Sequence, residues 1–375
     1  MDISSEMVLN LIPLFLANVL GVRTTVIGLI EGVAESTASI LRVFSGFVSD
    51  RVGSRKWMAV LGYAISAASK PVFYFAAAWG TVAGGRWADR VGKGVRTAPR
   101  DALVADSIDP PRRGLAFGVH RAADTAGAML GVLGALVAVW ITQGSAGPLQ
   151  AHTFRLIVLV SLVPAILAVI ALAVGSREVR IVQQERARPG FRGLGKPFGL
   201  FLLLVAFFEL GNSADAFLVL RARSLGESVV GILGMLVVFN LVYTLISAPA
   251  GALSDRVPRK AVIVAGWFAY ALIYLGIGAV GRSWAMWLWY AAYGAYYGAA
   301  YGTARALVAD IVPVALRGTA YGAYSTVVGA MNLPASVIAG FLWDRFSPGT
   351  PFFFGAAVAL VAAVGLLAWS PRTKD

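Results

Sequence analysis

The side chains best suited to chemistry in this sequence are the charged ones between positions 86 and 106. At about 100° per residue, a helix over this segment gathers them on one half of its surface and leaves Trp87, Val91, Val95 and Ala98 on the other. The charged set consists of Arg86, Asp89, Arg90, Lys93, Arg96, Arg100 and Asp101. Basic and acidic groups in such a row bind charged solutes or relay protons, and the segment predicts these two kinds of chemistry.

The sequence around this segment is that of a membrane protein. Of its 375 residues, 58% are hydrophobic and 14% are charged, whereas a soluble domain carries roughly 25% charged residues. Apolar runs of about twenty residues recur along the chain, which is typical of an all-α membrane protein and not of a barrel. Charges inside such a span must face the interior of the helix bundle or a water-filled cavity. We therefore predict a substrate path lined by Arg86, Asp89, Arg90, Lys93 and Arg96.

Composition excludes several other classes of function. The chain has no cysteine and two histidines, His120 and His152, so we expect no disulfide, no metal site and no cofactor. The net charge of +13 is assigned to basic loops beside the membrane and not to nucleic-acid binding. The sequence shows neither a nucleophile–base set nor a Gly-Lys-Ser/Thr nucleotide loop, so we expect neither an enzyme nor an ATP-driven pump.

The apolar runs predict about twelve transmembrane helices. They cover residues 4–21, 24–49, 57–79, 80–106, 115–141, 153–175, 198–220, 228–254, 260–280, 284–311, 319–343 and 350–370. A polar segment divides them, so we expect an N-terminal six-helix bundle over 1–175, a cytoplasmic linker over 176–197 and a C-terminal six-helix bundle over 198–375. Arg and Lys cluster after every second span and in the linker, which predicts that both termini are cytoplasmic. We expect a multi-pass monomer in the plasma (inner) membrane.

The two halves of the sequence repeat each other. Residues 102–118 (ALVADSIDPPRRGLAFG) match residues 306–322 (ALVADIVPVALRGTAYG), and residues 45–56 (SGFVSDRVGSRK) match residues 250–260 (AGALSDRVPRK). Because each half has an even number of spans, the halves share one orientation and are related by an axis along the membrane normal. This pattern predicts a transporter whose site lies between two pseudo-symmetric bundles.

The repeated motifs resemble those of the major facilitator superfamily (MFS) over essentially the whole chain. GFVSDRVGSRK (46–56) is similar to the superfamily's loop motif after helix 2, and GALSDRVPRK (251–260) to its weaker copy after helix 8. GAMLGVLG (127–134) is similar to the helix 5 glycine motif associated with antiporters, with Val132 in place of the usual proline. The resemblance implies the MFS fold and alternating access. It also implies a conformational latch at the cytoplasmic helix ends, formed by Asp50, Arg51, Arg55, Asp255 and Arg256.

Carboxyl groups within the spans are candidates for proton coupling. They are Glu31, Glu35 and Asp124 in the N-terminal half and Glu209 in the C-terminal half. A buried carboxylate gains proton affinity by desolvation and loses it beside arginine, so these groups could exchange protons near the charged face of 86–106. The alternative is a salt-bridge network that only holds the helices together.

The C-terminal half is predicted to add amides and aromatic rings to the path. The amides are Asn212 and Asn332, and the run WLWYAAYGAYYGAAYG (287–302) contributes positions 294 and 297, Gly294 and Tyr297. Tyrosines also pack well against glycine-lined helix grooves, so simple packing is the alternative for this run.

Together these features favour secondary active transport of a small organic solute, anionic or amphipathic, by alternating access. The carboxyl groups favour coupling to protons, and the glycine motif favours efflux. An organic-anion importer is the alternative within the same class. A non-transporting membrane receptor on a transporter scaffold is the alternative from another class, but it predicts a long sensing loop that the sequence lacks.

Overall fold

The structure of the chain is a computed structural model that describes residues 1–52, 54–107, 113–144, 147–178, 194–254, 257–300, 303–312 and 316–369. Within these ranges every regular element is a helix. The all-α prediction is therefore confirmed for the described part of the chain.

Helices of the first half are interrupted near prolines. The first predicted span is split into α1 (Asp2–Leu9), α2 (Ile12–Leu14) and a π-helical turn, η1 (Phe15–Val19). Pro13 lies in the first turn of α2, where a residue without an N–H is tolerated but cannot continue a preceding helix. A second break at Ser69, before Pro71, separates α4 (Arg55–Ala68) from α5 (Lys70–Tyr74). The remaining helices are α3 (Thr24–Val52), α6 (Trp79–Asp106), α7 (Arg113–Gln143) and α8 (Ala151–Gly175).

The second half also departs from the predicted continuous spans. The sequence predicted one helix over 198–220, but α9 (Gly195–Leu210) ends at Leu210 and α10 (Ala216–Ser224) begins six residues later along the chain. The other helices are α11 (Val229–Ser254), α12 (Arg259–Ala279), α13 (Ser283–Ala300), α14 (Thr303–Ile311), α15 (Arg317–Arg345) and α16 (Thr350–Ala368). Gly, Asn, Ser and Asp residues over 211–215 explain the break, since these residue types favour caps and turns over helix interiors.

Seven helical segments in the described ranges are long and apolar enough to cross a membrane. They cover residues 2–19, 123–143, 151–175, 229–247, 259–279, 320–345 and 350–368. α3 and α6 are longer than most of these, at 29 and 28 residues, but they carry the buried charges. Hydropathy therefore identifies helices with few charged residues and misses helices whose charged face lies inside the protein.

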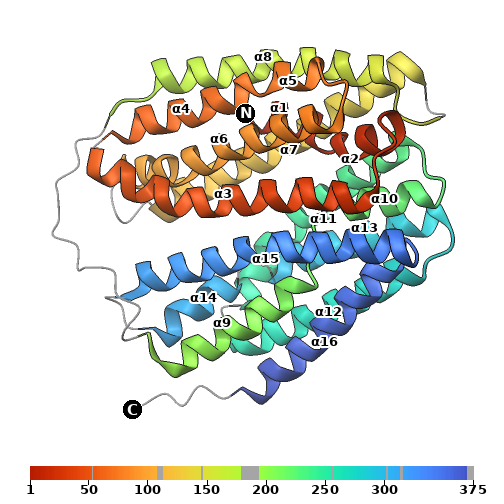
Figure 1. Ribbon diagram of the computed structural model, residues 1–375. Coiled ribbons are helices and arrows are strands. Elements are labelled where there is room, and N and C mark those ends of the chain that lie inside the picture. The colour runs from red at the N-terminus through yellow and green to blue at the C-terminus, as the bar shows by residue number, and fades with distance from the viewer. Residues whose placement is uncertain are drawn as a thin grey trace.

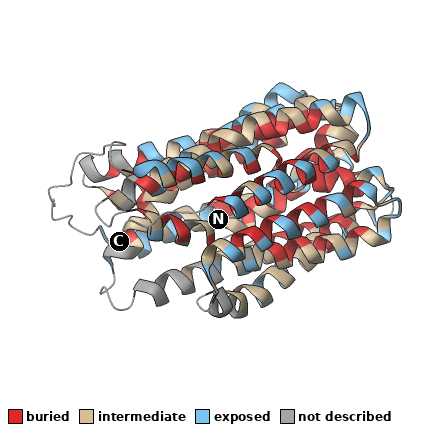
Figure 2. Ribbon diagram, turned by 90° about the horizontal axis from the view of Figure 1, so that it is seen from below, coloured by how far each residue is buried: buried red, intermediate tan, exposed pale blue. Residues whose placement is uncertain are grey.

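Apolar side chains cover the outer faces of the molecule. Along α8, Val163, Leu167 and Val174 are 60%, 60% and 81% exposed. Figure 2 shows such exposed residues on outward faces and the buried residues between helices. An exposed apolar surface of this extent is stable against lipid and not against water, so the chain is a multi-pass membrane protein.

The helices form two groups, α1–α8 and α9–α16, which lie on opposite sides in Figure 1. Among the described residues, the groups meet mainly where α3 packs along α15 and where α7 packs along α11. α10 adds smaller contacts with α2 and α3.

The contact between α3 and α15, which we call the seam, is built from small residues. A carbon atom added to Gly32 would lie 2.9 Å from the Cα of Leu333, so the two backbones touch directly. The Ser36 hydroxyl donates to the carbonyl oxygen of Gly329 at 2.7 Å. Away from this contact, the two helices diverge toward the Val52 end of α3 (Figure 1). The halves are thus joined at the Thr24 end of the seam and separated at the other end.

An aspartate from the second half caps the helix that begins in the first half. Asp344, at the end of α15, accepts hydrogen bonds from the backbone N–H groups of Thr24 and Thr25 at 3.2 and 2.8 Å. The Thr25 hydroxyl donates to the same carboxylate at 2.6 Å. The first N–H groups of a helix have no partner within the helix, and an aspartate oxygen is a preferred cap. These bonds therefore hold the end of the seam closed.

Replacing Asp344 by Ala is expected to make the seam open more often. A lost cap costs about 0.5–2 kcal/mol, so the population opened at this end should rise by about two- to thirtyfold. The chain has no cysteine, so Ser36→Cys, a position that is 7% exposed within the seam, can report opening by its maleimide labelling rate. The control is Asp101→Ala, which removes an exposed carboxylate outside the seam. Equal labelling rates in the two variants would contradict the role of Asp344.

Candidate functional site

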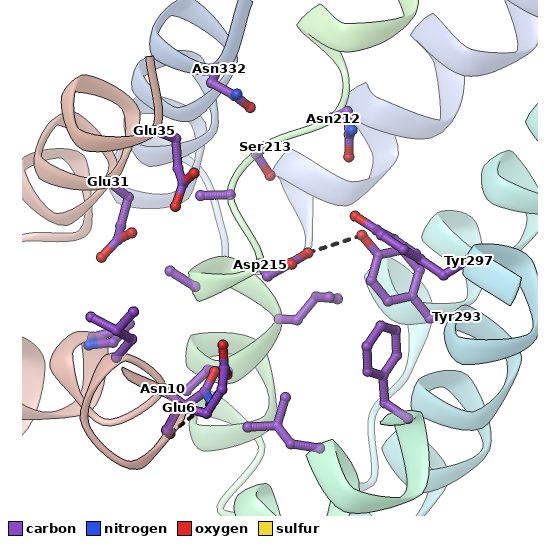
Figure 3. Close-up of a pocket in the computed structure, with 18 of the residues that line it drawn as sticks. Glu6, Asn10, Glu31, Glu35, Asn212, Ser213, Asp215, Tyr293, Tyr297 and Asn332 are labelled. Atoms are coloured by element: carbon purple, nitrogen blue, oxygen red, sulfur yellow. Dashed lines mark hydrogen bonds between the residues drawn. The ribbon is translucent and has the colours of Figure 1, made fainter. Parts of the chain in front are cut away.

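A cavity of about 480 Å³ lies between the two halves of the molecule. Its volume falls within the range of small-molecule sites, roughly 300–1,000 Å³. Figure 3 shows glutamates of α3 on one side and Asp215 with tyrosines of α13 on the other. The polar lining residues are Glu6, Asn10, Glu31, Glu35, Arg86, Arg90, Lys93, Glu209, Asn212, Ser213, Asp215, Asn240, Tyr243, Tyr290, Tyr293, Tyr297 and Asn332.

Arg86 of α6 is held by two glutamates of α3. Its Nη2 lies 2.6 Å from Glu31 Oε2 and 3.2 Å from Glu35 Oε1, and its Nε donates to both Glu31 oxygens at 3.1 Å. Arg86 and Glu31 are 4% and 3% exposed. Such a buried pair is tolerated only with good geometry, and removing one partner leaves the other charge uncompensated.

Arg90 and Lys93 follow Arg86 along the cavity face of α6. Arg90 Nε lies 3.1 Å from Glu35 Oε1. Lys93 lines the cavity, and in the described part of the chain no carboxylate lies within 4.0 Å of its ammonium group. The sequence predicted a predominantly basic surface here, but glutamates of α3 already compensate two of its three cations. Lys93 is therefore the cation that remains available to a solute.

Asp89 and Arg96 lie on a different side of α6 from the cavity. At about 100° per residue they are displaced by roughly 60° and 80° around the helix from Arg86. Lys70 Nζ lies 3.5 Å from Asp89 Oδ1, and the two side chains are 0% and 3% exposed. Arg96 donates to the Ser66 hydroxyl at 2.8 Å. Neither residue lines the cavity, so this edge of the charged face packs against α4 and α5.

Asp124 belongs to a separate cluster near one end of α7. Its Oδ2 lies 3.7 Å from Arg100 Nη1 and 3.4 Å from His120 Nδ1. The Asp124 side chain is 33% exposed and does not line the cavity. A role for Asp124 in proton coupling would therefore act through the end of α6 and not through direct contact with a solute.

The break between α9 and α10 turns polar side chains into the cavity. A carbon atom added to Gly211 would lie 3.0 Å from the carbonyl oxygen of Gly355, so the chain passes close to α16 at the break. Asn212 and Asp215, on either side of the turn, both line the cavity (Figure 3).

Glu209 is a buried carboxyl group without a basic neighbour. It is 7% exposed, and its Oε2 accepts a hydrogen bond from Asn212 Nδ2 at 2.9 Å. Asn212 Oδ1 in turn accepts one from the Tyr270 hydroxyl at 3.2 Å. Among the described residues, no Lys, Arg or His nitrogen lies within 4.0 Å of Glu209. In the described part of the chain, the Glu209 carboxyl group therefore contacts an amide, which is itself held by the Tyr270 hydroxyl.

The aromatic run of α13 reaches the cavity, but not through position 294. That position is Gly294 and has no side chain; a carbon atom added there would lie 2.5 Å from the carbonyl oxygen of Phe239, so the glycine allows α13 to approach α11. Tyr293 and Tyr297 line the cavity, and the Tyr293 hydroxyl donates to Asp215 Oδ1 at 3.1 Å. Asn332 of α15, as expected for a path residue, also lines the cavity.

Most of the predicted latch lies outside the described residues. This holds for Asp255 and Arg256, and for the side chains of Asp50 and Arg51. Arg55 is described and is 5% exposed. Its backbone N–H donates to Glu178 Oε1 at 2.9 Å, and its Nη1 donates to the Ala102 carbonyl oxygen at 3.2 Å. Arg55 thus ties α4 to α6 and to the segment after α8.

Several residues that shape the site were not selected from the sequence. Glu6 lines the cavity and accepts a hydrogen bond from Asn10 Nδ2 at 2.8 Å; their spacing of one helical turn was visible in the sequence. Lys70, the partner of Asp89, was a lone cation in an apolar run, which is a signal for a buried partner. No sequence signal distinguished Tyr290 from its neighbouring tyrosines.

Comparison with known proteins identifies relatives over the full length of the chain. The sequence profile of the Major Facilitator Superfamily matches residues 1–220 and 199–375. An uncharacterized MFS-type transporter of Methanocaldococcus jannaschii is 34% identical over 98% of this chain and 91% of its own length. An uncharacterized protein of Mycobacterium tuberculosis is 26% identical over 93% of this chain and 85% of its own length.

Solved structures of the same fold support this relationship. A D-xylose–proton symporter superposes with a TM-score of 0.78 at 17% identity, covering all of this chain and 94% of its own. A nucleoside transporter superposes with a TM-score of 0.77 at 14% identity, covering 98% of this chain and 96% of its own. At these identities the likeness concerns the fold. The chain is a member of the Major Facilitator Superfamily, a family of transporters and not of enzymes.

Proposed function

We propose that this protein is a proton-coupled secondary active transporter that moves a small organic solute, amphipathic or anionic, by alternating access. Twelve spans in two six-helix bundles, 1–175 and 198–375 with the linker 176–197 between them, would form the transport unit. The distribution of basic residues supports cytoplasmic termini and a location in the plasma (inner) membrane. The unit would work as a monomer, because both walls of the cavity come from one chain.

The main observation in support of the proposal is the cavity between the halves. Ion-paired and unpaired charged side chains line it together. Its lining combines the Arg86–Glu31 pair, the ammonium group of Lys93, which has no carboxylate within 4.0 Å in the described ranges, and two carboxyl groups of the second half, Glu209 and Asp215. Charges this far inside a membrane protein mark a path for a solute or for protons. A cavity closed by the seam at one end, with its helices diverging at the other, is the arrangement that alternating access needs.

A coupling role is best supported at Glu35 and Glu209. Glu35 is shared between Arg86 and Arg90 at 3.2 and 3.1 Å, and its side chain is 31% exposed, so a proton can reach it. Protonation would free the two arginines from Glu35 and change which charges face the solute. Among the described residues, no basic side chain lies within 4.0 Å of Glu209. Its negative charge would therefore be neutralised by binding a proton. Glu31 is buried and would act with Glu35, while Asp124 would act from outside the cavity.

The direction of transport is proposed as efflux. With cytoplasmic termini, the Thr24 end of the seam faces away from the cytoplasm, and the described conformation is closed on that side. The glycine motif that suggested efflux packs against α1, where a carbon atom added to Gly131 would lie 2.5 Å from the Ile3 carbonyl oxygen. Uptake into everted vesicles that exceeds uptake into right-side-out vesicles would support efflux, and the reverse would support an importer.

Neutralising the coupling carboxyl groups is expected to separate solute flux from the proton gradient. In proteoliposomes that contain a pH-sensitive dye, a transported solute from a panel of small organic acids and amphipathic amines should drive proton movement. Glu35→Gln and Glu209→Gln should each retain exchange of that solute and lose most of its dependence on the pH gradient. The control is Glu227→Gln, a carboxylate outside the cavity. Unchanged pH-gradient dependence in both cavity variants would rule out these coupling assignments.

A further inference from the structure

The cavity has more acidic than basic groups, and the surplus lies on the wall formed by the second half. Five carboxyl groups and three basic groups line it. Arg86 and Arg90 are engaged by Glu31 and Glu35. The remaining cation, Lys93, belongs to the first half, whereas Glu209 and Asp215, the lining carboxyl groups of the second half, have no Lys, Arg or His nitrogen within 4.0 Å among the described residues. The first-half wall therefore carries three carboxyl groups and three cations, whereas the second-half wall carries two carboxyl groups and no cation among the residues that line the cavity.

Asp215 is the carboxyl group of that wall best placed to meet a solute. It is the last residue of the break between α9 and α10, is exposed and lines the cavity, and accepts a hydrogen bond from the Tyr293 hydroxyl at 3.1 Å. Glu6, Glu31 and Glu35 line the same cavity. Glu31 and Glu35 are already paired with Arg86 and Arg90, whereas Asp215 has no cation within 4.0 Å among the described residues, so a cationic group of a solute would be stabilised most at Asp215.

Tyr290 provides an independent sign that a ligand group belongs here. It is 1% exposed and lines the same cavity, and its hydroxyl has no hydrogen-bond partner among the described residues. A buried hydroxyl without a partner is destabilising, and such groups in native structures call for an explanation. Tyr290, Tyr293 and Tyr297 follow the spacing of one face of α13. Their hydroxyl oxygens can accept hydrogen bonds, and their ring faces attract cations.

We propose that Asp215, Tyr290 and Tyr293 form a subsite for a protonated primary amine, and that Lys93 on the opposite wall receives the anionic group of the same solute. An ammonium group has three donors, which match one carboxylate oxygen and two tyrosine hydroxyls. The substrate class is then small zwitterionic amino compounds. This inference rests on the proposed transport function and specifies its substrate. Glu209, which accepts a hydrogen bond from Asn212, is assigned to proton coupling and not to the subsite.

The test is binding to the purified full-length protein by sets of probes with the same carbon skeleton. One set is phenylalanine, 2-phenylethylamine and 3-phenylpropionate; a second is 4-aminobutyrate, butylamine and butyrate. Amine-bearing probes should raise Tm, the zwitterion most of all, and the acids should raise it least. In Asp215→Asn, affinity for the amine probes should fall by about 10- to 100-fold, as expected for the loss of a charge-assisted hydrogen bond.

Tyr290→Phe is the companion variant, because it removes only the hydroxyl. The Tm of this variant without ligand should not fall, because the hydroxyl that it removes is buried and makes no hydrogen bond with the described residues. Its affinity for the amine should nevertheless fall about three- to tenfold, because the amine loses one hydrogen-bond acceptor. Glu227→Gln is the control and should bind as the unsubstituted protein does. The subsite is overturned if no amine-bearing probe binds, if the acids alone bind as tightly, or if both cavity variants keep full affinity for the amine.

Flux in proteoliposomes separates this inference from the transport function. If the amine probes bind through Asp215 but no probe is exchanged across the membrane, the subsite stands and the transport function fails. If acids without an amine are transported and Asp215→Asn leaves their flux unchanged, the transport function stands and the subsite fails. Stabilisation by Na⁺ that Asp215→Asn abolishes, without any effect of amines, would also overturn the subsite.

Discussion

Replacing Arg86 by Met is expected to abolish transport and to destabilise the folded protein by about 3–5 kcal/mol, the usual cost of removing one partner of a buried ion pair. The substitution leaves Glu31 and Glu35 without their shared cation, and Glu31 has almost no access to water. A carboxylate cannot stay charged at such a position without compensation. The loss should be measured as a lower Tm in detergent together with absent solute exchange in proteoliposomes.

A second substitution separates stability from function. Arg86→Met combined with Glu31→Leu replaces the pair by apolar groups, which is often neutral or stabilising, so Tm should recover while transport stays absent. The matched control is Arg259→Met. The Arg259–Asp310 pair is nearly as short, at 2.7 Å against 2.6 Å, but its side chains are 36% and 50% exposed, so its loss should cost about 0–1 kcal/mol. If the double variant recovers transport as well as Tm, the pair is structural and not part of the mechanism.

Replacing Gly28 by Ala is expected to reduce transport by about tenfold or more while the protein stays folded. The added methyl group would collide with the carbonyl oxygen of Ser336 and would lie 3.0 Å from the Phe217 ring. Backbone atoms on both helices cannot move aside without separating α3 from α15. Overpacking of this kind typically costs 1–3 kcal/mol, which displaces an equilibrium between two conformations by about 5- to 150-fold.

The seam should then open more often at its Thr24 end than in the unsubstituted protein. Ser36→Cys lies in the seam about two helical turns from position 28 along α3. Its maleimide labelling should be faster in the Gly28→Ala variant than in the protein that keeps Gly28. The control is Gly84→Ala, since a carbon atom added to Gly84 has no neighbouring atom within 4 Å. Normal transport by Gly28→Ala, with labelling no faster than in the control, would show that closure of this seam is not part of the cycle.

The sequence was informative about α6 because charge inside a membrane is so constrained. Seven charged residues on one half of a helix surface cannot meet lipid, so their orientation toward the interior followed from composition and periodicity. The sequence did not show, however, that these charged residues would have different surroundings inside the protein. Arg86, Arg90 and Lys93 face the cavity, whereas Asp89 and Arg96 meet Lys70 and Ser66 of the neighbouring helices. The charged face is wider than the cavity, and only the packing of α4 and α5 shows where it divides.

The predicted basic character of the site illustrates the same limit. Lys and Arg outnumber Asp and Glu in the segment 86–101, so its face alone indicated a site for anions. Glu31 and Glu35 lie more than fifty residues earlier, and only the packing of α3 against α6 brings them within 3.2 Å of Arg86. The break after Leu210, which turns Asp215 into the cavity, also depends on a close approach to Gly355.

The amino-acid sequence by itself determined that the chain is a helical membrane protein, that its halves repeat and that the repeated motifs are those of the Major Facilitator Superfamily. These properties follow from local hydropathy and from the spacing of motifs, both of which can be determined from the amino-acid sequence. The tertiary structure alone decided which charges neutralise one another, which stay free to meet a solute, and that Asp215, Tyr290 and Lys93 line the same cavity. Electrostatic free energy depends on distances between groups, and those distances join residues that lie far apart along the chain.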